Sequence, residues 1–276
     1  EAGGNKIALT RGAIIENSLF TENRGNGIWF DIGNEKCQVR NCLIADNENA
    51  GIFYEISYGL HAHDNVIVGN GFAFTPGAWG ASAGNSISSS PDCLIERNLL
   101  IGNKDGFSFR EQKRSTPLID GGSEAVWNHH ETVRNNVFAY NRDAQVWGWF
   151  DIDDQRHWPN SMQQEGGSLK AEGFGDGSAG LSLEDLKLTF ENNLYYPAVG
   201  QGLFNWGVTW KKSTKYRDLD AVRRELGFER GSVVADIAIK DFRKLDLRVP
   251  TDSPAIRMHC YPQGDVFSVK LGTYMK

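Results

Sequence analysis

Two acidic residues, Asp31 and Glu55, hold the same place in two similar phrases, GIWFDI (27–32) and GIFYEI (51–56). If these phrases are strands of adjacent coils, the two carboxylates lie about 5 Å apart, the spacing of strands in a sheet. Like charges that close cannot both ionise freely, so we expect a raised pKa for one of them. A protonated carboxyl beside an ionised one is the pair that glycoside hydrolysis uses, and this separation is nearer the retaining range. We favour Glu55 as the proton donor because apolar residues surround it; a solvated ladder or a cation site is the alternative.

Other outward positions of the same phrases carry groups that bind sugars. Aromatic rings stack on the C–H faces of sugars, and carboxylates accept hydrogen bonds from hydroxyl groups. We expect Trp29 and Trp149 to be sugar platforms and Asp151 to bind a distant sugar. Arg110 would hold a substrate carboxylate or sulfate, or it would neutralise the acidic residues. Strand alternation places these residues in two files, one with Asp31, Glu55, Thr75, Arg110 and Asp151, the other with Trp29, Phe53, Ala73, Ser108 and Trp149.

The histidines offer a different chemistry. His61 and His63 flank the inward-facing Ala62, so both should point outward, one corner away from Glu55. A histidine base near the groove would suit a lyase, and His63 is the best candidate, with His61 as a substrate contact. His129, like Tyr58 in the phrase GIFYEISYG, is a further candidate for substrate binding. A plain surface or turn position is the alternative for each histidine.

Metal chemistry has less support in the sequence. There is no HExxH phrase, and the histidine spacing does not favour a zinc site. Asp31 and Glu55 could together hold calcium, but calcium sites usually cluster more acids. We therefore expect no cofactor.

The elements that must position these residues are repeated coils. Five segments share one pattern, which ends in two apolar residues, two free positions and an Asn. A coil of this length cannot bury its apolar face alone, so neighbouring coils must stack. Asn suits the left-handed turns and amide ladders of such stacks. The predicted fold class is therefore all-β, a right-handed parallel β-helix. The closing residues, spaced by 24, 23, 33 and 38 positions, are Asn23, Asn47, Asn70, Asn103 and Asn141.

Alignment of the coils also predicts an interior aromatic stack and three insertions. The insertions span about 76–92, 112–130 and 153–187. Loops of such length are usually functional, and we expect them to wall a groove beside the outward strand face. The interior stack should contain Phe30, Tyr54, Phe74, Phe109 and Phe150.

The phrases GIWFDIGN, VRNCLIADN and GIFYEISYG resemble the right-handed β-helix repeat family, the pectate-lyase-like superfamily. The resemblance covers about residues 10–210 and implies a carbohydrate-active protein with a poly- or oligosaccharide substrate. That fold hosts several activities. A glycoside hydrolase is the leading hypothesis. A polysaccharide lyase or uronate epimerase, with a His base and Arg110, and a non-catalytic glycan-binding adhesin are the alternatives.

The chain reads as a single domain, with coils over about 10–210 and a C-terminal helix and closing tail over about 211–276. Residues 216–226 have helical spacing, and Gly227 stands where a helix would end. The first recognisable coil starts near Ala13 without a capping helix before it. Because a solenoid needs its terminal core covered, we expect earlier coils or a second chain to cover this end.

Composition excludes some functions. The formal charge is -6 and no basic face or tail is evident, so nucleic acid is not an expected partner. No apolar run approaches the roughly 18 residues of a membrane span. The four cysteines show no CxxC pair and are interpreted as buried thiols, with one disulfide as the alternative. We expect a secreted or periplasmic protein.

Overall fold

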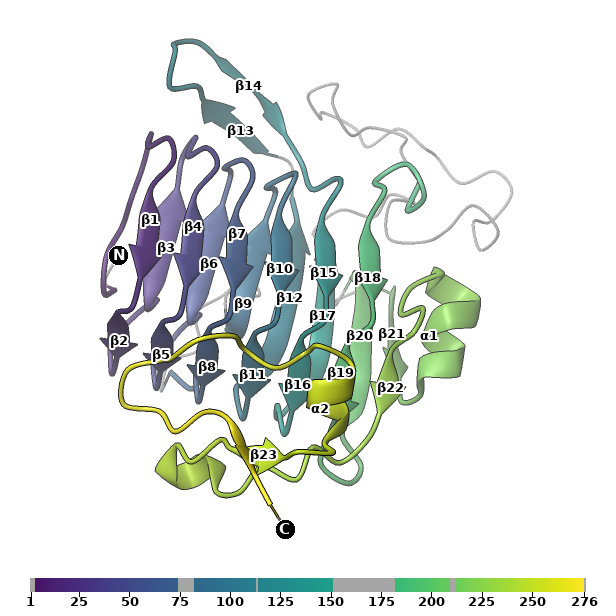
Figure 1. The fold of residues 1–276 in the computed structure, drawn as a ribbon. Coiled ribbons are helices and arrows are strands. Elements are labelled where there is room, and N and C mark those ends of the chain that lie inside the picture. The colour runs from purple at the N-terminus through teal and green to yellow at the C-terminus, as the bar shows by residue number, and fades with distance from the viewer. Residues whose placement is uncertain (1–2, 74–81, 113, 151–181, 209–211, 276) are drawn as a thin grey trace.

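The computed structural model describes residues 3–73, 82–112, 114–150, 182–208 and 212–275. These residues form three long parallel sheets that wrap around one interior (Figure 1). Each coil gives one strand to each sheet, so hydrogen-bonded neighbours in a sheet come from successive coils. The all-β, parallel β-helix predicted from the repeat is confirmed.

The first sheet contains β1 (Ile14–Glu16), β4 (Gln38–Arg40), β7 (His61–His63), β10 (Leu94–Glu96), β15 (Thr132–Arg134) and β18 (Thr189–Glu191). The second sheet contains β2 (Leu19–Thr21), β5 (Leu43–Ala45), β8 (Val66–Val68), β11 (Leu99–Ile101), β16 (Val137–Ala139), β19 (Leu194–Tyr196) and β22 (Val233–Val234). The third sheet contains β3 (Ile28–Asp31), β6 (Ile52–Glu55), β9 (Ala83–Ser88), β12 (Asp105–Glu111), β17 (Ala144–Phe150), β20 (Gly202–Val208) and the antiparallel β21 (Lys212–Tyr216).

Side chains inside the coils alternate with outward ones, as the period of two requires. The interior positions of Phe30, Tyr54 and Phe109 are confirmed, because all three are fully buried and belong to one core cluster. Phe150 is buried too, but it pairs with Glu111, one interior position beyond Phe109. The predicted Phe74 lies outside the described residues.

Two asparagine ladders tie the coils together at the turns. The predicted closing asparagines form the first ladder, in which each Nδ2 donates to the Oδ1 of the next, as from Asn23 to Asn47 at 2.7 Å and from Asn70 to Asn103 at 2.9 Å. From Asn47 onward these amides are buried, and they are paired as buried polar groups must be to avoid a desolvation cost. The second ladder runs through Asn65, Asn98, Asn136 and Asn193.

The third strand of the third sheet differs from the predicted one. The sequence phrase GFAFTP (71–76) suggested that strand, with an insertion after it, yet β9 is Ala83–Ser88 and the insertion precedes it. Packing explains the choice, because a file of glycines lies where coils come close. A Cβ on Gly51 would sit 2.5 Å from the Gly84 carbonyl oxygen, so Gly84, and not Gly71, holds the glycine position of this coil.

The C-terminal part consists of a helix and a tail, which have different roles. The predicted helix is confirmed as α1 (Leu219–Leu226), capped by Asp218 and ended by Gly227 at φ 75°. Its apolar side packs on the interior core and closes the last coil. The tail was predicted to close that coil, but it packs instead over the outside of the second sheet (Figure 1). The tail contains η3 (Phe242–Lys244), β23 (Val249–Pro250), α2 (Pro254–Arg257) and β24 (Thr273–Tyr274).

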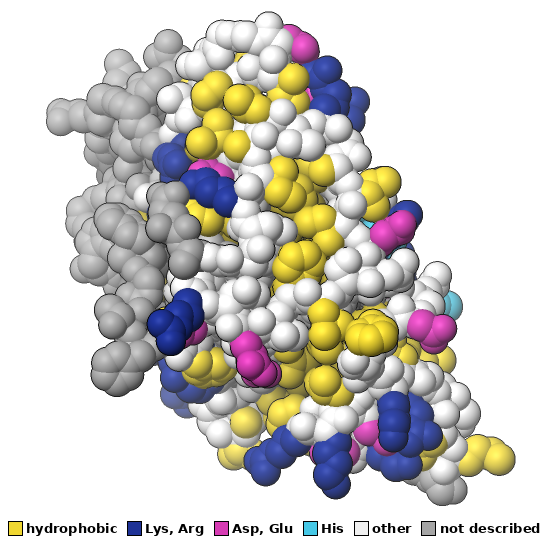
Figure 2. All heavy atoms as spheres, turned by 90° about the vertical axis from the view of Figure 1, so that its left-hand side faces the viewer, with side chains coloured by type: hydrophobic (Ala, Val, Ile, Leu, Met, Phe, Trp, Pro, Cys, Tyr) yellow, Lys and Arg dark blue, Asp and Glu magenta, His cyan; other side chains and the backbone are white. Residues whose placement is uncertain are grey.

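The opposite end of the stack has exposed apolar side chains (Figure 2). Leu9, Ile14 and Leu19 are each more than two-fifths exposed. Residues before the first sheet strands also take part in the stack, because Ile7 and Arg11 form parallel bridges with Phe30 and Glu35. The coils therefore begin earlier than the Ala13 start suggested by the sequence.

Cys37, Cys42, Cys93 and Cys260 are buried and free, as interpreted from the sequence. Among the described residues, no helix is long and apolar enough to cross a bilayer.

Candidate active site at the edge of the third sheet

Asp31 and Glu55 are direct neighbours across β3 and β6, in the register that the sequence predicts. Both side chains are largely buried, with 6% and 7% of their surface exposed. Each has a basic partner: Lys6 Nζ lies 3.0 Å from Asp31 Oδ2, and Arg114 Nη1 lies 2.6 Å from Glu55 Oε1. The repulsion expected between the carboxylates is therefore offset by two cations that the sequence pattern did not single out.

The acidic file continues differently from the prediction. After Glu55 come Ser88 and Arg110, and Arg110 pairs with Trp149. The guanidinium of Arg110 lies over the Trp149 ring, with Cζ 5.3 Å from the ring centroid. The sequence pattern predicts Trp149 beside Ser108, but the structure pairs Ser108 with Trp147. Trp149 is therefore shifted by two positions along β17, and its side chain still points outward. Thr75 and Asp151, the other predicted members, lie outside the described residues.

The neighbouring aromatic file begins as predicted. Trp29 and Phe53 stack with ring centroids 5.7 Å apart, and Lys6 Nζ lies 3.9 Å from the centroid of the Trp29 ring. The expected open sugar platform is not what these rings provide, because Trp29 is 9% exposed and Phe53 4%. Trp149 and Arg110 are equally buried, at 6% each. The outward face of the third sheet is thus a packed surface at these positions.

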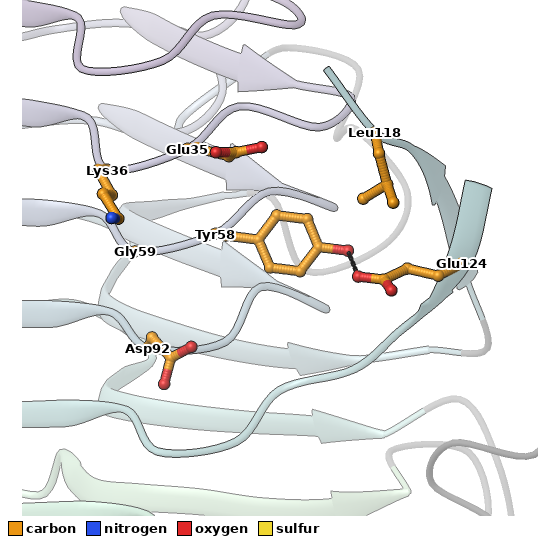
Figure 3. Close-up of a pocket in the computed structure, with 7 residues that line it drawn as sticks. All are labelled: Glu35, Lys36, Tyr58, Gly59, Asp92, Leu118 and Glu124. Atoms are coloured by element: carbon orange, nitrogen blue, oxygen red, sulfur yellow. Dashed lines mark hydrogen bonds between the residues drawn. The ribbon is translucent and has the colours of Figure 1, made fainter. Parts of the chain in front are cut away.

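A cavity of about 510 Å³ lies one turn beyond Glu55 (Figure 3). One wall consists of turn residues from successive coils, and the other consists of the hairpin β13 (Arg114–Pro117) and β14 (Ser123–Val126). Tyr58, a predicted substrate contact, projects into the cavity, and its hydroxyl donates to Glu124 Oε1 at 2.7 Å. Burial, and then this bond, raises the pKa of Tyr58. The lining residues are Glu35, Lys36, Tyr58, Gly59, Asp92, Leu118 and Glu124.

The hairpin is the part of the second insertion that walls this site. Arg114 at its start binds Glu55, Glu124 binds Tyr58, and Asp120 at its tip accepts a hydrogen bond from Arg11 at 2.7 Å. Backbone packing adds a fourth contact, because a Cβ on Gly33 would lie 2.2 Å from the Pro117 carbonyl oxygen. The hairpin therefore covers the turns, and not the strand face that the sequence led us to expect.

His61 and His63 lie on β7 of the first sheet, with stacked rings 4.1 Å apart. His61 Nε2 contacts Glu96 at 3.1 Å, and His63 Nδ1 contacts Asp64 at 2.6 Å. Burial, with the charge of His63, lowers the pKa of His61. The histidine base and the arginine expected for a lyase lie on different sheets, because His61 and His63 belong to β7 of the first sheet and Arg110 to β12 of the third.

His129 lies nearer the cavity than the other predicted histidines. It lines a second hollow of about 120 Å³ with Tyr58 and Glu124, and its ring centroid is 5.0 Å from that of Trp127. Burial lowers the pKa of His129. Its Nδ1 is 2.7 Å from Nδ1 of the adjacent His130, and Asp92 completes a group of potential metal ligands. Within the described residues, no third histidine, cysteine or acidic side chain joins Asp31 and Glu55 in such a group.

Comparison with known proteins supports the architecture. Residues 1–90 match a family model described as right handed beta helix region. This match is consistent with a right-handed parallel β-helix family, and the strand pairing continues the same architecture to β20. No curated protein and no solved structure matched the chain. The fold is common among carbohydrate-active enzymes, but it does not distinguish a hydrolase, a lyase or a binding protein.

Proposed function

We propose that this protein is a glycoside hydrolase that acts outside the cytoplasm on a poly- or oligosaccharide. The observation that carries the proposal is the in-register pairing of Asp31 and Glu55 on adjacent strands. Strand spacing is about 4.8 Å, and carboxyl groups about 5 Å apart suit a retaining mechanism with a covalent intermediate.

The contacts of the two carboxylates suggest a division of roles. The Arg114 guanidinium donates to Glu55 Oε1 and fixes its position, which suits a nucleophile better than the proton donor expected from the sequence. Asp31 Oδ1 is buried and accepts no hydrogen bond. That oxygen has no hydrogen-bond partner among the described residues, whereas Lys6 Nζ contacts Oδ2, so Asp31 is the proposed proton donor.

The cavity beside Glu55 is the proposed sugar subsite. Its size lies within the usual range of ligand pockets. Tyr58 offers an aromatic face, and Glu35 and Asp92 offer carboxylates to sugar hydroxyls from neighbouring turns (Figure 3). A walled pocket, in contrast to an open groove, favours removal of terminal sugars.

The test is a digestion of a glycan library with the wild-type chain and the variants Glu55→Gln and Asp31→Asn. Loss of a positioned acid or base typically costs about 10²–10⁴-fold in rate, so both variants should release reducing sugar at least about a hundredfold more slowly. Glu16→Gln is the matched control, because Glu16 is also a strand carboxylate paired with an arginine, Arg40, but lies on the first sheet. Wild-type activity in a folded Glu55→Gln variant would contradict the proposal.

A glycan-binding protein without catalysis is the second candidate. The ion pairs of Lys6 with Asp31 and of Arg114 with Glu55 favour it, because they occupy both carboxylates. This candidate predicts retention of a glycan on an array with no product in the digestion. An unsaturated product absorbing near 235 nm would instead indicate a lyase.

A further inference from the structure

A repeated turn between the third and first sheets brings three potential metal ligands together. In every one of these turns a residue has a left-handed backbone, at Lys36 (φ 53°), Gly59 (69°), Asp92 (61°), His130 (57°) and Lys187 (53°). The turns are equivalent, because in the first four of them the backbone N–H of the left-handed residue donates to the carbonyl of the residue just before the next left-handed one. Asp92 N–H thus donates to His129 O at 2.9 Å. Asp92 and His130 therefore hold the same position on adjacent coils.

The left-handed backbone also explains why two consecutive histidines meet. In an extended strand, neighbouring side chains point to opposite faces. The positive φ of His130 breaks that alternation, and the Nδ1 atoms of His129 and His130 come within 2.7 Å. A non-glycine residue in this conformation typically costs about 1 kcal/mol or more, and here the conformation is imposed by the repeated turn.

The three side chains match the donor set of a zinc site. One ligand atom from each of Asp92, His129 and His130 lies within 4.8 Å of the others. Zinc bonds to imidazole nitrogen and carboxylate oxygen are about 2.0–2.2 Å long in tetrahedral sites, which places ligand atoms about 3.3 Å apart. Asp92 and His130 are exposed and His129 is half-buried, so small side-chain rotations can reach that spacing.

We propose that Asp92, His129 and His130 form a binding site for a zinc-type divalent cation, with a fourth position open to water or to a ligand. Asp92 lines the large cavity (Figure 3) and His129 lines the smaller hollow, and the two share Tyr58 and Glu124, so the ion would lie between them. The sequence predicted no such site, because neither histidine spacing nor strand alternation brings these residues together. Lys187, the next residue of the file, adds a positive charge nearby, so binding should be weaker than in a closed four-ligand site.

The test is a titration of the tag-free, chelator-treated full chain with zinc chloride, followed by calorimetry and by thermal unfolding. One equivalent should bind, and calcium and magnesium chloride should not compete. His130→Asn and Asp92→Asn should each weaken zinc binding by at least about tenfold; Asn tolerates the left-handed backbone, so His130→Asn should fold.

His259→Ala is the matched control, because His259 is also exposed and left-handed (φ 55°) but lies in the C-terminal tail. It should bind zinc as the wild type does. Absence of binding to the wild type, unchanged binding in folded His130→Asn, loss of binding in His259→Ala, or competition by calcium would each overturn the proposal. The readout is binding and not hydrolysis, so the outcome is independent of the proposed activity.

Discussion

The two histidine pairs of this protein arise in different ways and have different surroundings. His61 and His63 are two residues apart on β7, so strand alternation aligns them. Each already has a carboxylate partner, and Arg97 joins those partners, Asp64 and Glu96. His129 and His130 are consecutive and meet only because a turn residue is left-handed.

The difference separates a pair that stabilises the fold from a pair available for a ligand. The outward file of the first sheet alternates acidic and basic residues over most of its length, which gives the buried carboxylates partners on neighbouring coils. That file reads Glu16, Arg40, His63, Glu96, Arg134 and Glu191. The turn that carries His129 and His130 belongs to no such file of alternating charges. A histidine pair in a closed network is therefore a weaker functional candidate than one beside a cavity.

Removal of Glu96 should produce the largest effect. Its carboxylate, 8% exposed, contacts His61, Arg97 and Arg134 at 3.0–3.1 Å. Glu96→Ala leaves these donors without their acceptor, although the partly exposed arginines can rehydrate, so we expect a loss of about 2 kcal/mol in the free energy of unfolding. Asp92→Ala at the other pair should cost less than about 0.5 kcal/mol. Urea unfolding measures both.

A matched control for this comparison is Glu191→Ala. Glu191 holds the same file position on β18, but its partner Arg230 is 89% exposed. Exposed pairs contribute about 0–1 kcal/mol. Equal losses for Glu96→Ala and Glu191→Ala would show that the buried network adds nothing.

Glycine substitutions should give a smaller effect with opposite directions at the two pairs. His61→Gly places glycine inside a strand, which costs about 0.5–1 kcal/mol before the lost contacts are counted. His130→Gly should leave stability unchanged or raise it, because glycine adopts φ 57° without strain. Urea unfolding with chelator present measures both variants. Equal destabilisation of the two variants would mean that the left-handed backbone of His130 carries no strain that glycine can relieve.

The smallest expected effect is on the pH dependence of stability. Burial lowers the pKa of His61 and of His129 in the folded state. The unfolded chain then binds more protons, so both histidines make stability fall as pH drops below about 6.5. Glu229 acts in the opposite sense, because burial raises its pKa to about 7 and stability falls as pH rises towards that value. His61→Gln should therefore lose stability less steeply on acidification than the wild type. Parallel curves of unfolding free energy against pH would contradict this assignment.

The repeat predicted the coils well because the same interactions recur in each. The side-chain amides of Asn47 and Asn70 each donate a hydrogen bond to the Asn of the next coil, as their spacing suggested. The prediction failed at β9, where the strand is built of small polar residues around Ile87 and lacks the aromatic phrase of its neighbours. There, the close backbone approach between Gly51 and Gly84 decides the register, and this contact cannot be predicted from hydrophobic periodicity.

The site was predictable only where it belongs to the repeat. Asp31 and Glu55 pair as expected because the segment that joins their strands contains no insertion. Arg114 could not be foreseen, since it belongs to a hairpin whose position depends on packing over Gly33. His130 was visible in the sequence, but its meeting with Asp92 requires a backbone conformation that histidine seldom adopts.

The four buried thiols allow local opening of the solenoid to be followed by chemical labelling. Only the thiolate reacts readily with thiol reagents, and burial raises the pKa of Cys93 well above its usual range and that of Cys260 to about 12. A reagent can therefore reach each sulfur only when its surroundings open. Cys37 and Cys42 report on an early coil, Cys93 on a middle one and Cys260 on the tail. The order in which these four sulfurs become labelled would reveal whether the tail detaches before the coils open, and whether the early coil opens before the middle one.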